Sequence, residues 1–261
     1  MQNEKILVVG ATGRVGGAAV RGFLEAGFRV RALVRRPQRG EPLRALGAGP
    51  GRGASEMVEY RGNVSLLSAV RSAGVRRFVY SSVHLANHPL AQKVGAFREK
   101  ARFEEELLAA EDVSSTILRP AIFMETLHMM LRGSVAFVPG RQRRPVSWIA
   151  TRDIARAAIR AFQADILGRH EIAGPDVTTF DGAFERLARA RGKGIQVLHV
   201  PLIAMRLSGR ASPYLRELAN MMAFFDAVGF AVEHSHLRDT FGVHALTIEE
   251  WVRGNSVPGV S

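Results

Sequence analysis

Three glycines near the N-terminus have the spacing of a phosphate-binding turn. Gly10, Gly13 and Gly16 directly follow the apolar run 6–9, and a helical pattern begins among them. Gly10 would let the chain leave a strand in a tight turn, Gly13 would let backbone approach a pyrophosphate, and Gly16 would let the helix pack closely on the sheet. The N–H groups at a helix N-terminus attract phosphate. The spacing therefore predicts a dinucleotide site, the alternative being a βαβ unit that binds no nucleotide.

Arginines at the end of the second predicted strand, at 29–34, bear on the choice of dinucleotide. Arg35 and Arg36 stand where a carboxylate would bind a ribose with a free 2′-hydroxyl, and Arg14 lies within the glycine turn. A guanidinium binds a 2′-phosphate through paired hydrogen bonds and stacks on adenine. These residues favour NADP(H) over NAD(H). The alternative is that they are surface arginines in an arginine-rich chain.

Two histidines follow a buried strand expected at 77–82, at the edge where a substrate would meet a nicotinamide. A histidine titrates near neutrality, so His84 or His88 could donate a proton there. The alternative is that both are loop histidines in solvent. His128 and His170 are isolated in the sequence, and no His, Asp and Glu cluster has metal-ligand spacing.

The elements that must position these residues alternate along the chain. Further strands are expected at 115–118, 171–173 and 195–200, and helices at 57–72, 97–110, 151–163, 179–190, 216–229 and 248–251. In the helix at 97–110, Leu108 is expected to face the core and Glu104 largely to face water. Thr151 and Thr247 are expected to cap helices. Alternation of this kind predicts an α/β, Rossmann-type, doubly wound and mainly parallel sheet with ligands beyond the carboxyl ends of its strands.

Composition and charge limit the class of protein. The chain has 261 residues, of which 47% are apolar, and no apolar run is long enough to span a bilayer. The N-terminus runs directly into the first strand, so we expect a cytoplasmic protein. Zero cysteines exclude disulfides and thiolate chemistry. The formal charge is +12, but the arginines are scattered without interleaved aromatic residues, which disfavours nucleic-acid binding.

Six short sequence motifs follow one another along the chain. They are GATGRVG at 10–16, GVRRFVYSSV at 74–83, REKARFEEELL at 98–108, TILRPAIFMETL at 116–127, SWIATRDIARAA at 147–158 and LTIEEW at 246–251. In this order they resemble the NmrA-like NAD(P)-binding branch of the atypical short-chain dehydrogenase/reductase superfamily. The resemblance implies cofactor contacts from Gly10, Thr12, Gly13, Arg14, Val15, Gly16 and Ser81, with Arg35 reading the phosphate. It also implies that Lys100 holds the nicotinamide ribose, the alternative being a surface i,i+4 partner of Glu104.

Three features depart from the family's pattern. Ala96 stands where a catalytic tyrosine is expected, four residues before the lysine, and the position of the carbonyl-polarising serine or threonine falls near Val83. The usual proton donor is therefore absent, which leaves His84, His88 or water for that role. In addition, the glycine-rich stretch Gly47–Gly53 replaces a strand, a helix and a strand, so we expect a sheet shortened by about two strands.

These observations predict one NAD(P)-binding Rossmann domain over 1–261, with 121–146 and 174–261 contributing a small, mostly helical C-terminal substrate lobe. Two functions stay open. One is an NADPH-dependent oxidoreductase that reduces a small apolar carbonyl or quinone-like compound. The other is an NADP(H)-binding sensor or regulatory protein without turnover. The expected partner is a small-molecule substrate, no membrane partner is expected, and oligomerisation stays open.

Overall fold

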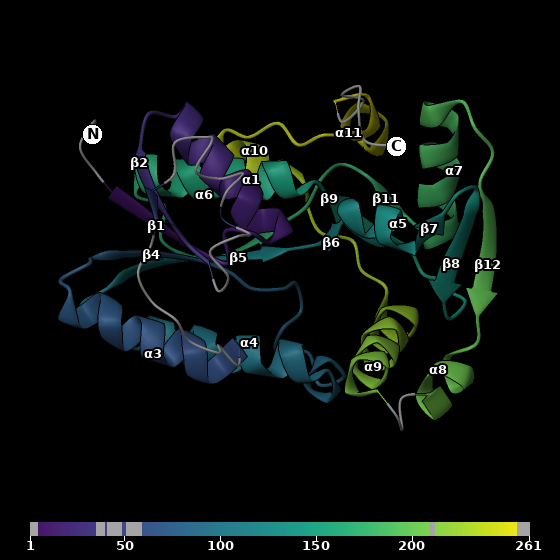
Figure 1. Ribbon diagram of the computed structural model, residues 1–261, viewed down its shortest axis with the longest axis horizontal. Helices are drawn as coiled ribbons and strands as arrows, with labels where there is room; N and C mark the ends of the chain where they lie inside the picture. The colour runs from purple at the N-terminus through teal and green to yellow at the C-terminus, as the bar shows by residue number, and fades with distance from the viewer. Residues whose placement is uncertain (1–4, 35–39, 41–48, 51–58, 209–211, 255–261) are drawn as a thin grey trace.

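Strands and helices alternate through the first two thirds of the chain. The structure is a computed structural model that describes residues 5–34, 40, 49–50, 59–208 and 212–254. Figure 1 shows helices α1 and α6 over one face of the strands and α3 and α4 over the other, the layered α/β arrangement that the sequence predicts. In chain order the elements of this part are β1 (Lys5–Val9), α1 (Arg14–Glu25), β2 (Arg29–Leu33), β3 (Gly49–Pro50), α3 (Glu59–Ser72), β4 (Arg77–Ser81), the 3-10 turn η2 (Ala91–Lys93), α4 (Gly95–Leu108), β5 (Ser114–Pro120), α6 (Thr151–Ala164) and β10 (Gly168–Ile172).

The strands form two parallel three-stranded sheets. Their orders are β1–β2–β3 and β10–β5–β4, and within the described strands no hydrogen-bonded ladder joins β1 to β4. Helix α6 packs on both sheets. Its Ala155 and Ile159 belong to the core of β1, α1 and β2, whereas its Ile154 and Ala157 belong to the core of β5 and β10. One helix therefore links the two halves of the Rossmann-type layer.

The first strand is buried on one face only, although residues 6–9 are all apolar. Ile6 and Val8 are buried, whereas Leu7 between them is 49% exposed. Helices α1 and α6 cover the buried face. Helices α3 and α4 instead share a core with β4 and β5, so within the described part of the chain no helix covers Leu7.

The glycine-rich stretch Gly47–Gly53 lies largely outside the described residues. Strand β3 is described there, and it pairs in parallel with β2 through Arg31 and Ala32. Strand β3 therefore extends the sheet of β1 and β2, but β3 is only two residues long. The predicted shortening of the sheet stays a prediction.

Helix α4 corrects part of the predicted burial pattern. Leu108 is 39% exposed, and Phe103 is fully buried instead. Glu104 is also fully buried, because Arg119 on β5 and Arg169 on β10 lie against it and both pair with its carboxylate. A pattern of apolar residues cannot reveal a buried carboxylate whose partners lie on other strands.

The C-terminal part adds helices and two small sheets, with orders β11–β9–β6 and β12–β8–β7. Figure 1 places most of these elements at the end of the molecule away from β1. Among the described helices, none is both long and apolar enough to cross a membrane. The elements are β6 (Ile122–Phe123), α5 (Glu125–Met130), β7 (Leu131–Arg132), β8 (Val135–Pro139), β9 (Val146–Ile149), β11 (Val177–Thr178), α7 (Phe180–Arg191), β12 (Gln196–Val200), α8 (Leu202–Ser208), α9 (Pro213–Val228), α10 (Ser235–Phe241) and α11 (Ile248–Gly254).

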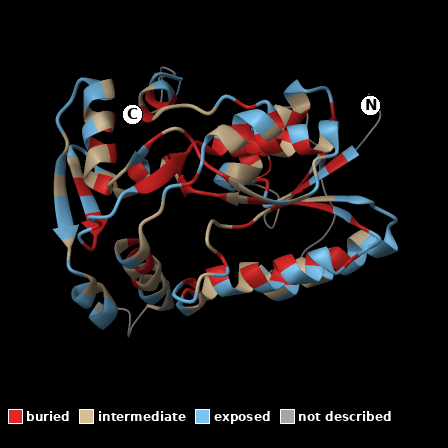
Figure 2. Cartoon of the chain, turned by 180° about the vertical axis from the view of Figure 1, so that it is seen from behind, coloured by how far each residue is buried: buried red, intermediate tan, exposed pale blue. Residues whose placement is uncertain are grey.

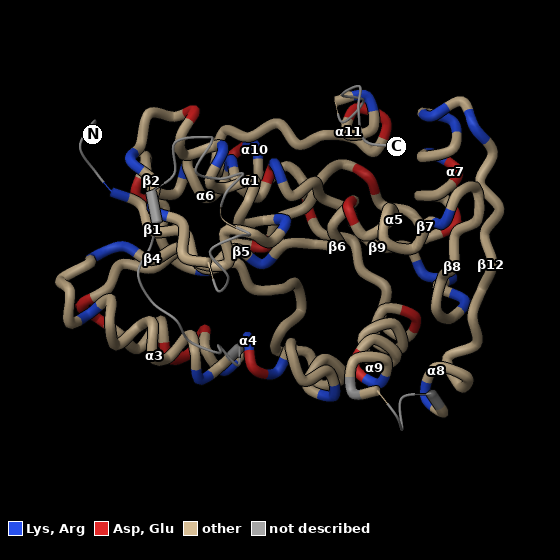
Figure 3. The backbone as a smooth tube through the Cα atoms, in the orientation of Figure 1, with Lys and Arg blue, Asp and Glu red and all other residues tan. Residues whose placement is uncertain are grey.

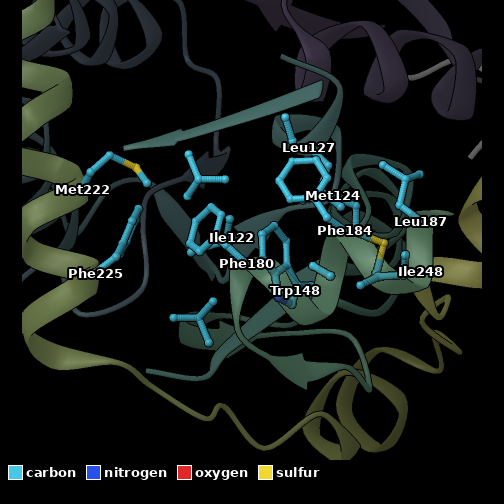
Figure 4. Packing of buried hydrophobic residues seen from close by; sticks show 14 of the residues in the cluster. Ile122, Met124, Leu127, Trp148, Phe180, Phe184, Leu187, Met222, Phe225 and Ile248 are labelled. Carbon is cyan, nitrogen blue, oxygen red and sulfur yellow. The ribbon is translucent and has the colours of Figure 1, made fainter. Parts of the chain in front are cut away.

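This part is built on one large apolar core. Trp148 is fully buried at its centre and meets the ring of Phe180 edge-on, with 5.0 Å between ring centres (Figure 4). Met124 and Met222 are buried in the same cluster (Figure 4). Figure 2 shows buried residues on the central strands and, interrupted by exposed ones, along the helices packed on them. These methionines therefore serve as core residues.

One predicted helix cap is confirmed and one is wrong. Thr247 precedes α11, where its hydroxyl accepts from the Glu250 N–H at 3.2 Å and Glu250 accepts from the Thr247 N–H at 2.9 Å. Thr151 does not cap α6, because Ala150 occupies the cap position. The carboxylate of Glu125 on α5 takes the capping role and accepts from the Thr151 N–H at 3.1 Å and the Thr151 hydroxyl at 2.8 Å.

Candidate active site

The glycine turn requires glycine at two of its positions. Gly10 has a φ of +70°, a conformation that glycine adopts without steric cost. The Gly13 N–H donates to the Gly10 carbonyl at 2.8 Å and closes the turn. A Cβ on Gly16 would lie 2.2 Å from the Gly10 carbonyl oxygen, so a side chain there would push α1 away from the turn.

The turn is open to solvent at the N-terminus of α1. Gly10, Thr12, Gly13 and Arg14 are exposed, whereas Val15 packs partly into the core around β5 and α6. The first turn of α1 contains no acidic residue. The first N–H groups of a helix lack intrahelical acceptors and form the positive end of its dipole. An exposed, glycine-lined helix N-terminus of this kind fits a pyrophosphate.

Arg14 connects the turn to the C-terminal part. One Nη of its guanidinium lies 2.6 Å from the Sδ of Met129 on α5, and Met129 is 45% exposed. A cationic and an apolar side chain therefore flank the turn together. Arg35 and Arg36, the other arginines predicted to read a 2′-phosphate, lie outside the described residues.

Lys100 lies at the carboxyl end of β4. Its Nζ donates to the Ser81 carbonyl at 3.0 Å and lies 5.3 Å from the centre of the Tyr80 ring. The alternative of a surface pair with Glu104 is wrong, since Glu104 is fully buried between arginines. The glycine turn follows the carboxyl end of β1, so the structure places Lys100 and the turn at the same ends of their parallel strands.

His84 is not a loop histidine in solvent. Its side chain is only 11% exposed, and its Nδ1 lies 2.5 Å from a carboxylate oxygen of Glu171 on β10. Its ring packs on Phe230 with 4.6 Å between ring centres, and its backbone N–H donates to Pro120 at 3.0 Å. Both the ring and the backbone of His84 are thus fixed.

His88 has a different environment. Its Nδ1 accepts from the Leu90 N–H at 3.1 Å, which places the proton of a neutral ring on Nε2. The ring meets Phe224 of α9 with 5.8 Å between ring centres. The two predicted histidines therefore differ, because His84 pairs with a carboxylate and His88 does not.

The sequence interpretation missed a network of charged groups next to His84, and Figure 3 shows basic and acidic residues close together around β5. Glu171 also accepts from Arg119 at 3.2 Å, and Arg119 pairs with Glu104 at 2.5 Å. Glu104 in turn pairs with Arg169 at 3.1 Å. Burial disfavours the charged form of Arg119, but its hydrogen bonds to Glu104 and Glu171 outweigh this effect and raise the pKa of Arg119. The available signal was Glu171 at the start of the strand expected at 171–173, and Arg119 directly after the strand expected at 115–118.

Two histidines that are isolated in the sequence have close neighbours in the fold. The rings of His170 and His236 stack with 5.3 Å between centres, and His128 accepts from Arg191 at 2.8 Å. Across the residues that the structure describes, no group of three His, Asp or Glu could hold a metal ion. A crevice of about 350 Å³ lies between α6 and the segment after α10, and no predicted site residue lines it.

Comparison with known proteins decides the family. A sequence model of the NmrA-like family matches residues 2–48 and 53–252. The chain belongs to the NmrA-like family. The match is interrupted within the glycine-rich stretch, where the sequence departs from the expected pattern.

Relatives in this family have different described roles. The chain is 25% identical to a photosystem II assembly factor of Synechocystis sp., over 77% of this chain and 72% of that protein. It is 26% identical to an NAD(P)H azoreductase of Xenophilus azovorans, over 76% of this chain and 77% of that protein. The fold matches the NADPH-dependent quinone oxidoreductase of Escherichia coli, solved with NADPH, at a TM-score of 0.77 and 19% identity, covering 96% of this chain and 99% of that one.

Proposed function

We propose that this protein is an NADP(H)-dependent oxidoreductase that reduces a small apolar carbonyl or quinone-like compound. The observation that carries the proposal is that the open glycine turn and Lys100 stand at the carboxyl ends of parallel strands, with the Lys100 Nζ fixed 3.0 Å from the Ser81 carbonyl. Ligands of open α/β sheets bind at this edge. The match to an NAD(P)H azoreductase and the fold shared with a quinone oxidoreductase support the same class.

Each site residue has a separate role in this proposal. The backbone of Gly10, Thr12, Gly13, Val15 and Gly16 receives the pyrophosphate, while Arg14 and Arg35 favour the additional phosphate of NADP(H). Lys100 donates to the nicotinamide ribose and keeps its bond to Ser81. When bound, the cofactor supplies a hydride.

His84 supplies the proton in place of the missing tyrosine. Reduction of a carbonyl requires a proton on oxygen, and Ala96 stands where a tyrosine is expected to donate it. His84 is fixed near the carboxyl ends of β4 and β5, since its N–H is bonded to Pro120. His88 is the weaker candidate, because its Nδ1 is engaged within its own loop.

The C-terminal residues 121–146 and 174–261 form the substrate lobe in this proposal. The contact of Arg14 with Met129 supports it, since it brings α5 beside the glycine turn. Exposed apolar side chains such as Met129 suit an apolar substrate.

Oxidation of NADPH in the presence of a panel of quinones, aldehydes and azo compounds tests the proposal. We expect at least one class to be reduced, with a faster rate for NADPH than for NADH. If NADPH binds and no compound oxidises it, turnover is refuted. The second candidate function, a cofactor-binding regulatory protein, would then be preferred. Ala96 in place of the tyrosine and the match to an assembly factor favour this second function.

A further inference from the structure

Glu171 is placed to control which ring nitrogen of His84 carries the proton. One of its carboxylate oxygens lies 2.5 Å from His84 Nδ1, and the other accepts from Arg119 at 3.2 Å. An ionised carboxylate can only accept hydrogen bonds, so Nδ1 must be the donor. His84 Nε2 has no hydrogen-bond partner among the described residues and is the nitrogen left for a ligand.

The Glu171 carboxylate is itself held in place by Arg119 on the neighbouring strand. Register in the parallel pair of β5 and β10 sets Glu171 opposite Arg119. Arg119 is only 12% exposed and is anchored by the fully buried Glu104. This chain of alternating charges fixes Glu171, while Phe230 fixes the plane of the His84 ring at 4.6 Å.

We propose that Glu171 is a positioning residue for His84. It holds Nδ1 protonated, directs Nε2 toward the substrate and stabilises the imidazolium that donates the proton, with Arg119 and Glu104 keeping Glu171 in place. This inference rests on the proposed function, since it concerns the proton that carbonyl reduction needs.

Reduction of a carbonyl substrate consumes one hydride and one proton. The carbonyl carbon gains a hydride from NADPH, the π pair of the C=O bond moves to oxygen, and that oxygen takes the proton from His84 Nε2. The products are an alcohol, NADP⁺ and a neutral imidazole that keeps its Nδ1–H bond to Glu171. Water then returns a proton to Nε2.

Substitution of Glu171 by glutamine tests the role with little change in shape. In Glu171→Gln the amide oxygen would face Arg119 and the amide NH₂ would face Nδ1, which would then have to accept rather than donate. An imidazolium cannot form without loss of that bond. We expect kcat for a carbonyl or quinone to fall at least about tenfold, with the Kd of NADPH unchanged and partial recovery in Glu171→Asp.

A second substrate separates proton delivery from structural damage. A triarylmethyl cation dye takes up a hydride and needs no proton. We expect Glu171→Gln and His84→Gln to slow carbonyl or quinone reduction but to leave dye reduction within about twofold of the wild type. Equal slowing of both reactions would overturn the positioning role.

Nitrogen-15 NMR of the histidine rings tests the inference without any turnover. In the wild type the neutral His84 ring should carry its proton on Nδ1, and in Glu171→Gln on Nε2. A neutral wild-type ring that carries its single proton on Nε2 instead of Nδ1 would overturn the inference. If the wild type reduces neither substrate although the Nδ1 tautomer is found, the proposed function fails while the placement of the proton stands.

Discussion

Single residues decide whether the site can hold a dinucleotide. Gly16 touches the turn so closely that a methyl group has no room, and Lys100 is tied to the end of β4 at 3.0 Å. Two substitutions probe these positions separately, one through shape and one through charge.

Replacement of Gly16 by alanine should loosen the turn. The new Cβ would approach the Gly10 carbonyl oxygen to 2.2 Å, so α1 or the turn must shift. We expect Gly16→Ala to lower the free energy of unfolding by about 1–3 kcal/mol and to weaken NADPH binding. Urea denaturation and a fluorescence titration measure the two effects. Gly17→Ala is the matched control, because its Cβ would meet only an ordinary contact at 3.4 Å; equal losses in both variants would contradict the account.

Removal of the Lys100 ammonium should weaken cofactor binding without unfolding the protein. A hydrogen bond from a charged group contributes about 1.5–3 kcal/mol, so Lys100→Met should raise the Kd of NADPH by roughly 10- to 100-fold. Isothermal titration calorimetry checks this value. Lys93→Met, an exposed lysine of η2, is the control and should bind as the wild type does. An unchanged Kd in Lys100→Met would remove the ribose role.

Elements position the charged groups through register and packing. The parallel pairing of β5 with β10 and the packing of α4 bring Arg119, Arg169 and Glu104 together. Removing one partner of a buried ion pair leaves an uncompensated charge, which destabilises strongly.

Substitution of Glu104 should show the cost of that unpaired charge. Glu104→Gln leaves two arginines against a neutral amide, and we expect a loss of about 3–5 kcal/mol in the free energy of unfolding. Chemical denaturation at neutral pH measures it. Glu105→Gln, next along α4 and 64% exposed, should cost less than about 1 kcal/mol. Similar small losses in both variants would show that the buried network contributes little.

The pair of stacked histidines predicts a pH effect on stability. Burial lowers the pKa of His236, and the nearby His170 lowers it further. The folded state therefore binds this proton less readily than the unfolded state. Stability from this residue is complete above the unfolded pKa of about 6.5 and is lost as the pH falls through the lowered folded value. Denaturation at pH 7.5 and 5.0 should show a smaller acid loss for His236→Gln than for the wild type; an equal loss would contradict this origin.

At the scale of the whole molecule, local patterns predict the fold better than the site. The glycine turn and the strand–helix alternation depend on neighbours in sequence, so α1, β4, β5 and α6 could be located from residue patterns alone. The pairing of His84 with Glu171 joins residues 87 positions apart, and nothing local indicates it. Glu104 on helix α4 shows the same limit, because its burial depends on arginines from the two strands β5 and β10.

The two parallel sheets are joined through α6. Within the described strands they share no ladder, and α6 provides packing to both. The glycine turn follows β1 of one sheet and Lys100 lies beside β4 of the other, so a cofactor held by both would depend on how the two sheets are placed. A bound dinucleotide would contact both halves and should stabilise the folded protein.

Direct titration of the protein with NADPH, followed by the fluorescence of the reduced nicotinamide, tests the central claim most directly. We expect saturable binding with a Kd in roughly the micromolar range, corresponding to about 8 kcal/mol, and weaker binding of NADH. Failure of both NADPH and NADH to bind below about 1 mM would contradict the assignment of the glycine turn and Lys100 as a cofactor site.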